Sequence, residues 1–430
     1  MLTLETAPPV ALNPIPYALT LTEDQQAAMN GVKAWLTTAK AGDIYRLYGL
    51  AGCGKTTCSV KLKEIEHPIR SAPLRVLYVA FTNRAVSILE SKGCVPVRTM
   101  HSLLYDVEEY SEEEKKEARM MKQAYLEAVL AGVPPDQRPP LPPSNKRIGF
   151  GLRTAESLAD QVRDFDVIAV DECSMIGQKM GRDLLKLNRP IIGIGDPGQL
   201  KPVGDVAFFS RHKPETLLTQ VLRTDNDILE LASWVRRGGS FSEIDSGENF
   251  TIARKAQPEW FDADITACGI HDKRRKINEH VRMLRGFEGI VPNVGERVIA
   301  VQNNKDEGIL NGQLWIVTRS EPIGDYVKLD LVEYAPRKKE EDLEIRVDVR
   351  VHLGCFQKDI KDSTEMGIDV RPDSVLMTWG YAVTVHKLQG SEFNSVLLFD
   401  DGPVFRDQID EWRYTGVTRA AKTLYVVSRH

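Results

Sequence analysis

The chain has 430 residues, more than one hydrophobic core supports, and this length predicts two to four domains. Its hydrophobic content of 42% is ordinary for a globular protein, and its net charge of −5 excludes an overall basic field, although a local basic groove for nucleic acid remains compatible with that total. The six cysteines are scattered, which predicts reduced thiols rather than disulfides or a zinc site. No window approaches the roughly 18 apolar residues of a membrane span, so we expect a cytoplasmic protein without a membrane partner.

Short apolar runs alternate with helical patterns along the chain. The first set of predicted strands covers 43–48, 74–80, 166–170 and 190–194, and each of them ends at a polar cluster. Such a series is typical of a parallel sheet whose functional loops follow the strand C-termini. A second set predicts another α/β domain of similar style, at 261–267, 377–383, 395–399 and 423–427.

The first predicted strand leads directly into a phosphate-binding loop. Residues 49–56 read Gly-Leu-Ala-Gly-Cys-Gly-Lys-Thr and match G-x-x-x-x-G-K-[ST], with a helical pattern after them. Glycines at this spacing let backbone N–H groups turn toward phosphate oxygens at the positive end of the helix dipole. Lys55 can then reach the β- and γ-phosphates, and the Thr56 hydroxyl can ligate Mg²⁺. A chance glycine-rich turn is the alternative, which the flanking patterns disfavour. The residues expected to bind the nucleotide here are Gly49, Ala51, Gly52, Cys53, Gly54, Lys55, Thr56 and Thr57.

The segment 105–154 differs in composition from its surroundings. It predicts a helix from Ser111 to about Leu130, then a stiff proline-rich stretch at 134–143, then a basic run with Phe150 between two glycines. We interpret the segment as an inserted subdomain with a small strand pair that touches the substrate. A surface excursion without a function is the alternative.

Phosphoryl transfer further needs a metal carboxylate and a group that activates water. Asp171 and Glu172 directly follow the third predicted strand. Asp171 is therefore the candidate that holds Mg²⁺ together with Thr56, and Glu172 is the candidate that accepts a proton from the attacking water. Gln199, in the loop after the next strand, can hydrogen-bond both water and the γ-phosphate, with a plain Gly/Pro turn as the alternative.

Two arginines of the second domain are candidate clamps for the γ-phosphate. Arg223 ends the segment Gln220-Val-Leu-Arg223, and Arg419 lies in the segment Tyr414-Thr-Gly-Val-Thr-Arg-Ala420. An arginine offered across a domain cleft stabilises charge in the transition state and makes hydrolysis depend on closure. A lone arginine is more often part of a surface ion pair, so both assignments depend on the motif order of the whole chain.

A second insertion is predicted at 294–373. Its short strands are separated by turns such as Asn311-Gly312, which indicates a small antiparallel barrel. The predicted domains are therefore 1–104 with 155–213, then 214–293 with 374–430, interrupted by insertions at 105–154 and 294–373.

Taken in order, the motif segments resemble those of superfamily 1 helicases. They are 21–25, 49–56, 80–85, 99–102, 171–174, 195–202, 220–223, 381–393 and 414–420. The run His386-Lys-Leu-Gln-Gly390 is the most diagnostic. Its Gln389-Gly390 is similar to the RecD-like and Dda-like branch, whereas the UvrD/Rep branch usually has Lys-Gly there. The Asn-Gly strand pair at 308–317 and the compact length are similar to the same branch.

This resemblance implies an α/β fold of two RecA-like parallel-sheet domains that form a nucleotide cleft. The insertion at 105–154 would carry a pin, and the one at 294–373 would be an SH3-like β-barrel. ATP and Mg²⁺ are the implied cofactors, with Gln25 reading the adenine and Glu392 meeting the ribose. The implied catalytic residues are Lys55, Asp171, Glu172, Gln199, Arg223 and Arg419.

The resemblance also implies a track for single-stranded nucleic acid. Phe150 would be the tip of the pin. Phe81 stands where the family usually has proline, and a place in the core is as good an explanation for it as base stacking. A lone histidine is more often a satisfied core or surface group than a ligand. The implied track residues are Phe81, Thr82, Asn83, Thr99, His101, Thr384, His386 and Lys387.

The activity implied is that of an ATP-dependent DNA helicase that translocates 5′-to-3′ on single-stranded DNA and unwinds duplex. Its partners would be single-stranded DNA, junctions of single-stranded and duplex DNA, and replication or recombination proteins, in the cytoplasm of a bacterium or a phage-infected cell. Residue chemistry alone leaves two alternatives open. One is an RNA helicase or remodeller, and the other is an NTP-dependent switch that binds nucleic acid without unwinding it.

Overall fold

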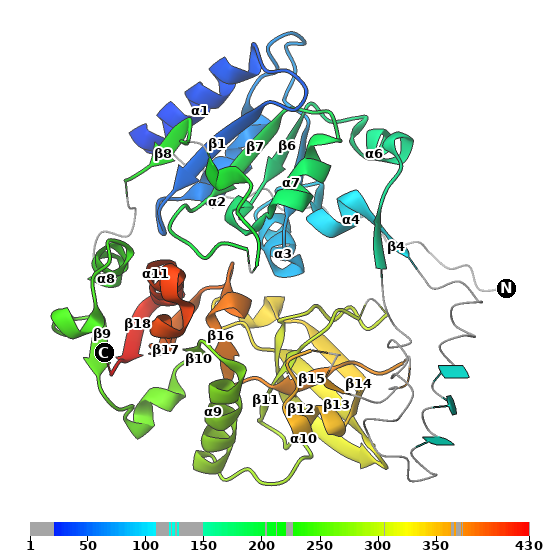
Figure 1. The fold of residues 1–430 in the computed structure, drawn as a ribbon, viewed down its shortest axis with the longest axis vertical. Helices are drawn as coiled ribbons and strands as arrows, with labels where there is room; N and C mark the ends of the chain where they lie inside the picture. Colours follow the sequence, from blue (N-terminus) through cyan, green and yellow to red (C-terminus); the bar gives the residue numbers. More distant parts are fainter. Residues whose placement is uncertain are drawn as a thin grey trace.

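The described residues of the computed structural model run from 21 to 429. Gaps lie at 109–119, 122, 125–126, 129–148, 203, 212, 221–226, 305, 363–364, 367–370 and 372, and the side chains of 107, 108, 149, 150 and 211 are also outside the description. Three sheets dominate the described part, two of them parallel and one antiparallel (Figure 1).

The first α/β domain is built on a six-stranded sheet. Its strands are β1 (Ile44–Gly49), β2 (Val76–Ala80), β3 (Val97–Thr99), β6 (Val167–Val170), β7 (Ile191–Gly195) and β8 (Thr216–Leu218). They pair in parallel in the order β3-β2-β6-β7-β1-β8. The helices are α1 (Glu23–Leu36), α2 (Lys55–Lys61), α3 (Asn83–Ser91), α4 (Met100–Leu104), α6 (Ala155–Val162) and α7 (Gln178–Leu185), with 3-10 turns η1 (Leu62–Glu64), η3 (Cys173–Met175) and η4 (Phe209–Arg211).

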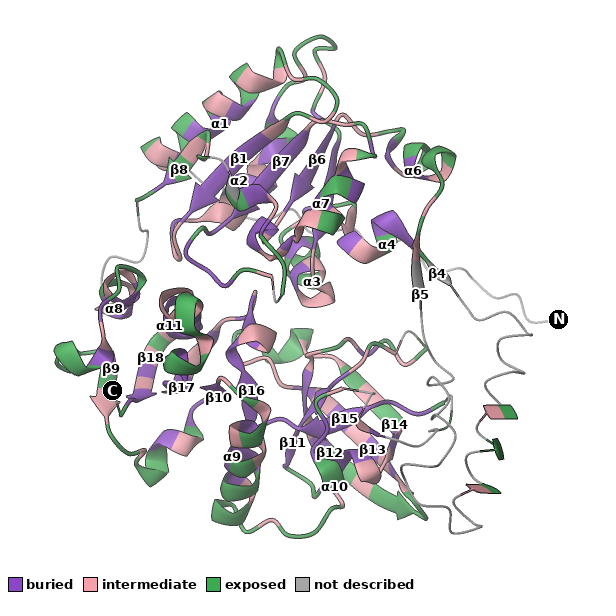
Figure 2. Ribbon diagram, viewed as in Figure 1, coloured by how far each residue is buried: buried purple, intermediate pink, exposed green. Residues whose placement is uncertain are grey.

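This sheet is buried because apolar clusters cover both of its faces. Every residue of β2, β6 and β7 is buried (Figure 2), as expected for continuous apolar runs in a parallel sheet. The strand β8 pairs with β1, so 216–218 belongs to the first sheet, although the predicted boundary put it after residue 213, in the second domain. Only three residues form β8, and so short a strand leaves no periodic signal in the sequence.

The insertion after β3 and α4 begins and ends as a two-stranded ribbon. Strands β4 (Tyr105–Glu108) and β5 (Gly149–Leu152) pair antiparallel, with Val107 opposite Phe150. The proline-rich stretch at 134–143 lies outside the described residues.

The second α/β domain has a five-stranded parallel sheet. Its strands are β9 (Phe250–Ala253), β10 (Ile265–Cys268), β16 (Ala382–Thr384), β17 (Phe393–Phe399) and β18 (Ala420–Val427), in the order β16-β10-β17-β18-β9. The helices are α8 (Asp227–Arg236), α9 (His271–Leu284) and α11 (Ile409–Val417), with 3-10 turns η5 (Phe241–Glu243), η6 (Pro258–Asp262), η9 (Val385–Leu388) and η10 (Gly402–Gln408). In Figure 1, α11 lies on the side of this domain that faces α2 and the first domain.

An antiparallel sheet fills the second insertion. It consists of β11 (Arg297–Ala300), β12 (Leu314–Ile323), β13 (Tyr326–Glu333), β14 (Ile345–His352) and β15 (Met377–Trp379), in the order β14-β13-β12-β11-β15, with α10 (Gly354–Lys358) and η7 (Glu340–Asp342). Val375 bridges to Val351 and donates its N–H to Arg350 O at 2.8 Å, which joins the two edges of the sheet into a barrel.

The predicted strand 377–383 is in fact two strands. Met377–Trp379 completes the barrel as β15, and Ala382–Thr384 joins the parallel sheet as β16. Gly380 lies at the crossing, where a Cβ would approach the Val298 backbone to 2.8 Å. An unbroken apolar run hid this change of sheet. Within the described ranges, no helix combines the length and the apolar composition needed to cross a membrane.

Candidate nucleotide site and nucleic-acid cavity

The phosphate-binding loop lies between β1 and α2, as the motif predicts. The backbones of Gly52 and Gly54 are left-handed, with φ of 80° and 78°, a region that side chains rarely allow. A Cβ on Gly49 would lie 2.4 Å from the Cys53 sulfur. Burial raises the pKa of the Cys53 thiol, so this cysteine is a passive part of the loop. The loop therefore has the tight, glycine-dependent turn that a phosphate cradle requires.

Lys55 holds its ammonium over this loop. Its Nζ donates to the carbonyl oxygens of Gly49 and Leu50 at 2.8 and 3.1 Å and lies 3.5 Å from Asp196 Oδ2. Burial opposes the charge of Lys55, but the neighbouring carboxylates, Asp196 first among them, raise its pKa above the usual value. Lys55 is therefore a permanent cation at the place where a triphosphate would lie.

An acidic pair follows β6. Glu172 has a left-handed backbone with φ 49°, and its buried Oε2 has no hydrogen-bond partner among the described residues. Burial, and then the charge of Glu172, raise the pKa of Asp171. Two neighbouring, partly buried carboxylates suit a divalent cation, since the cation would compensate their charge. The described residues contain no cluster of three or more metal-ligating side chains, so Mg²⁺ would depend on Asp171, Thr56 and phosphate oxygens.

Gln199 and Arg419 reach the same region from different domains. Gln199 is 4% exposed, and its Oε1 has no hydrogen-bond partner in the described part of the chain. Arg419 is 5% exposed and donates to the backbone oxygens of Thr415 and Ser391, both at 2.9 Å. Burial lowers the pKa of Arg419, while the carboxylate of Glu172 opposes that shift. Arg223, the other predicted clamp, lies outside the described residues.

Two residues of this site carry roles that sequence reasoning missed. Asp196, in the loop after β7, is fully buried beside Lys55, and Tyr414 on α11 donates its hydroxyl to Asp196 at 2.8 Å. Both residues lie inside motif segments, 195–202 and 414–420, and this location was the signal available. Motif membership alone did not show that they meet, because they are far apart in sequence.

Gln25 and Glu392 contact protein groups as well. Gln25 is 2% exposed, donates to Cys53 O at 3.1 Å and accepts from Thr22 N at 3.1 Å in a capping box at the start of α1. Gln25 thus lies directly against the phosphate loop. Glu392 pairs with Arg337 of the barrel.

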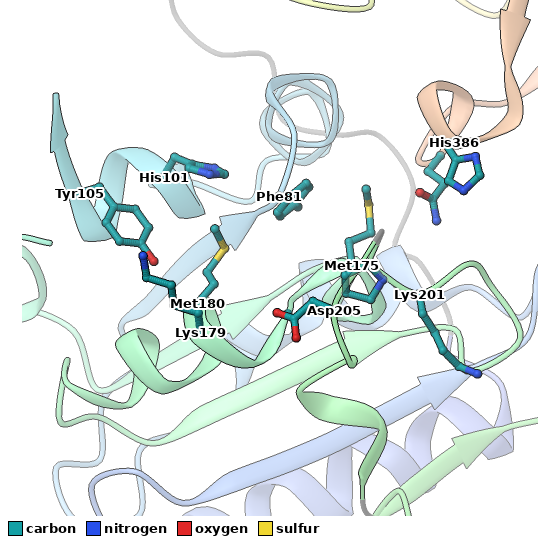
Figure 3. A pocket seen from close by; sticks show the side chains of 12 residues that line it. Phe81, His101, Tyr105, Met175, Lys179, Met180, Lys201, Asp205 and His386 are labelled. Atoms are coloured by element: carbon teal, nitrogen blue, oxygen red, sulfur yellow. The ribbon is translucent and has the colours of Figure 1, made fainter. Parts of the chain in front are cut away.

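A cavity of about 580 Å³ lies between the two α/β domains (Figure 3). Three predicted track residues lie on it: Phe81 and His101 from the first domain, and His386 from the second. Burial lowers the pKa of both histidines, so their imidazoles are neutral near pH 7. The remaining lining residues are Tyr105, Met175, Gly177, Lys179, Met180, Lys201, Pro202, Asp205 and Gln389. Aromatic and methionine side chains on such a wall suit the flat faces of bases.

Three other predicted track residues contact protein groups: two cap helices locally, and one reaches the barrel. The hydroxyl of Thr82 accepts from Ala85 N and caps α3, and the hydroxyl of Thr99 accepts from Ser102 N and caps α4, both at 3.1 Å. Asn83 donates to Asn303 Oδ1 of the barrel at 3.0 Å. None of the three lines the cavity.

Thr384 and Lys387 line a separate small pocket beside Arg274 and His271. Burial, followed by the charge of Arg274, lowers the pKa of Lys387 to about 8. The side chain of Phe150 lies outside the described residues, although its backbone belongs to β5.

Comparisons with known proteins agree with this geometry. A family model described as AAA domain matches residues 20–249. The chain belongs to the AAA domain family. A second family model, described as UvrD-like helicase C-terminal domain, matches residues 380–427 of the same chain. Together the two models confirm the resemblance to superfamily 1 helicases and the identification as an ATP-hydrolysing helicase.

Solved structures with the same fold are Pif1 helicases. Bacteroides Pif1 bound to ssDNA matches this AAA-domain chain with a TM-score of 0.53 and 17% identity, covering 95% of this chain and 92% of that one. Candida albicans Pif1 matches with a TM-score of 0.54 and 14% identity, covering 96% and 95%. These likenesses confirm the α/β fold with two RecA-like domains. A comparison with curated protein sequences finds no match.

Proposed function

We propose that this helicase acts on DNA, holding single-stranded DNA in the cavity between its two α/β domains and moving 5′-to-3′ as it hydrolyses ATP with Mg²⁺. Its substrates would be single strands and their junctions with duplex. Replication or recombination proteins would be its partners, in the cytoplasm of a bacterium or a phage-infected cell.

The observation that carries this proposal is the shared wall of the cavity. Phe81 and His101 come from the first domain, and His386 and Gln389 come from the second. Any movement of one domain relative to the other changes the distance between these walls. The grip on a strand would therefore change with each opening and closing of the domains.

The loop that follows β7 connects the cavity to the nucleotide site. The segment after β7 places Asp196 beside Lys55 and Lys201 on the cavity wall, only five residues later. Lys201 also pairs with Glu411 on α11 at 2.7 Å. Nucleotide chemistry at Lys55 is thus one short loop away from the proposed strand and from the second domain.

Three considerations support DNA and the direction of movement. Bacteroides Pif1, which has the same fold, is described bound to ssDNA, and another Pif1 structure concerns DNA unwinding at forked dsDNA. The apolar and aromatic lining suits unpaired bases. Gln389-Gly390 resembles the 5′-to-3′ branch of superfamily 1.

The deciding experiment measures unwinding of duplexes that carry either a 5′ or a 3′ single-stranded tail. We expect strand separation with ATP and Mg²⁺ only on the 5′-tailed DNA. Unwinding from the 3′ tail alone would overturn the direction. Strand-stimulated ATP hydrolysis without separation on either substrate would identify a switch rather than a motor.

A parallel series with RNA strands of the same sequence tests the substrate. We expect weaker stimulation of ATP hydrolysis by RNA than by DNA. Equal or stronger stimulation by RNA would favour the RNA helicase that residue chemistry left open.

The β4–β5 ribbon would carry the pin that splits the duplex, with Phe150 at its tip. In Phe150→Ala, unwinding should fall more than the ATP hydrolysis that single strands stimulate. An equal fall in both would contradict a pin.

A further inference from the structure

One hydroxyl group joins the two α/β domains across the nucleotide site. Tyr414, on α11 of the second domain, is 2% exposed and accepts a hydrogen bond from Ala51 N of the phosphate loop at 2.9 Å. The same hydroxyl donates to Asp196 Oδ2 at 2.8 Å. Burial raises the pKa of the Tyr414 phenol far above its usual value, so the donated proton is present throughout the physiological range.

The helix that carries Tyr414 is fixed firmly to its own domain. The neighbouring Arg413 forms a buried ion pair with Asp400, with nitrogen–oxygen distances of 3.1 and 2.8 Å. Arg419 follows the C-cap of α11, five residues after Tyr414. Because α11 moves as one unit, a displacement of the tyrosine hydroxyl also displaces the C-terminal end of α11, which directly precedes Arg419.

A second contact ties α11 to the loop after β7. The Leu200 side chain is fully buried in the hydrophobic core of the second domain, although Leu200 belongs to the first. Its N–H donates to Thr415 Oγ1 at 3.0 Å, and its carbonyl accepts from Gln389 Nε2 at 3.2 Å. The loop that carries Asp196 is therefore seated in the second domain.

Lys55 and Tyr414 share one oxygen atom. Asp196 Oδ2 accepts from the tyrosine hydroxyl and lies 3.5 Å from Lys55 Nζ. When a bound triphosphate draws the Lys55 ammonium toward its phosphates, the electrostatic interaction between Lys55 and the Asp196 carboxylate weakens. A buried carboxylate with fewer partners binds its remaining donors more strongly, and Tyr414 is one of them, with Gly198 N at 3.0 Å as another.

We infer that Tyr414 is a positioning residue. Its hydrogen bond to Asp196 would transmit a change in the position of Lys55 to α11, and α11 would place Arg419 for hydrolysis. This inference rests on the proposed ATP-driven function and gives it a physical link between the two domains. Tyr414 does not touch the reacting atoms, and it acts through Arg419.

The variant that tests this role is Tyr414→Phe, which keeps the ring in the core and removes both hydrogen bonds. We expect kcat for ATP hydrolysis to fall by about 10- to 100-fold, the loss typical of a hydrogen bond to a charged group, while KM for ATP changes by less than about threefold. A purely structural role would instead lower nucleotide affinity and thermal stability together. An unchanged kcat, or a change in KM alone, would overturn the inference.

A double-mutant cycle shows whether Tyr414 acts through the arginine. In the Arg419→Lys background, single-turnover hydrolysis should fall by less than about threefold when Tyr414→Phe is added, because the two residues act as a unit. An equal fall in both backgrounds would overturn the proposed path. Tyr45→Phe is the matched control, because the Tyr45 hydroxyl lies away from the cleft and hydrogen-bonds Thr216 over a distance of 2.6 Å. The kcat of this variant should stay unchanged.

The same measurements separate this inference from the proposed function. If the parent chain shows no strand-stimulated ATP hydrolysis, the proposed function fails. If the parent is active and the cycle is additive, only the role of Tyr414 fails.

Discussion

The candidate nucleotide site and the proposed strand-binding cavity differ in how their side chains are held. Around the phosphate loop, Lys55 and Asp196 hydrogen-bond to backbone groups of tight turns, with distances of 2.8 to 3.1 Å. In the cavity, Phe81 and His101 meet edge-on with ring centroids 5.7 Å apart, and His386 comes from the other domain. The first site depends on short-range geometry, and the second depends on where two domains meet. Substitutions should therefore act on chemistry in the first site and on strand affinity in the second.

The largest effect is expected at Lys55. Lys55→Ala removes the cation of the phosphate loop, so both nucleotide binding and ATP hydrolysis should fall below detection while the thermal unfolding profile keeps its shape. Lys63→Ala, an exposed lysine just after α2, is the matched control and should hydrolyse ATP normally. Retained turnover in Lys55→Ala would contradict the assignment of the loop.

A smaller loss, confined to catalysis, is expected at Arg419. Arg419→Ala should bind a fluorescent ATP analogue as the parent does, yet hydrolyse ATP about 10³- to 10⁵-fold more slowly, because the arginine stabilises transition-state charge. Exposed Arg429→Ala serves as the control. If hydrolysis survives in Arg419→Ala, the clamp across the cleft is wrong.

The cavity is tested at Phe81. Loss of one base-stacking face costs about 1–3 kcal/mol, so Phe81→Ala should weaken single-strand binding by about 5- to 150-fold, measured by fluorescence anisotropy, and leave ATP affinity unchanged. Phe287→Ala, in the turn after α9, should bind DNA normally. A drop in the unfolding temperature without a loss of DNA affinity would instead make Phe81 a core residue.

Thr82 tests whether a predicted track residue acts through structure. Thr82→Ala removes the cap of α3 and should lower the free energy of unfolding by about 1 kcal/mol in a denaturant titration. Thr82→Ser keeps the capping hydroxyl and should restore stability. If the alanine variant is as stable as the parent but binds DNA poorly, the hydroxyl serves the strand rather than the helix.

The smallest effect is a pH dependence that belongs to the second domain. The pKa of Lys387 is lowered to about 8 by burial, and lysine is charged only below its pKa. Between about pH 7 and pH 9 the side chain therefore loses its charge, and affinity for a phosphate backbone should weaken by about threefold to tenfold. Lys387→Gln should remove this dependence. An identical pH profile in both proteins would exclude Lys387 from the track.

Sequence reasoning predicted the local structure around the phosphate loop because these residues lie in one contiguous motif. A strand, a glycine loop and a helix fix the position of Lys55 from local geometry alone, and Asp171-Glu172 follows its strand directly. The contact between Asp196 and Tyr414 escaped because it joins positions 218 residues apart. No local pattern shows such a meeting.

Two differences between the predicted and the observed fold have clear local causes. The three residues of β8 are too few for a period-two signal, so they were placed in the wrong domain. The apolar run at 377–383 passes through two sheets, because Gly380 lets the chain cross close to Val298. Thr82 and Thr99 show the matching difficulty for function, since a threonine after a strand serves equally well as a helix cap or as a phosphate contact.

The buried side chain of Leu200 has a consequence for the working cycle. Complete separation of the lobes would bring this leucine into water, at a cost of roughly 1.5–3 kcal/mol, in addition to breaking its two backbone bonds. We therefore expect the two α/β domains to rotate about the buried Leu200 side chain rather than to separate. The domains would then stay in contact throughout the cycle, with Leu200 as the common hinge point.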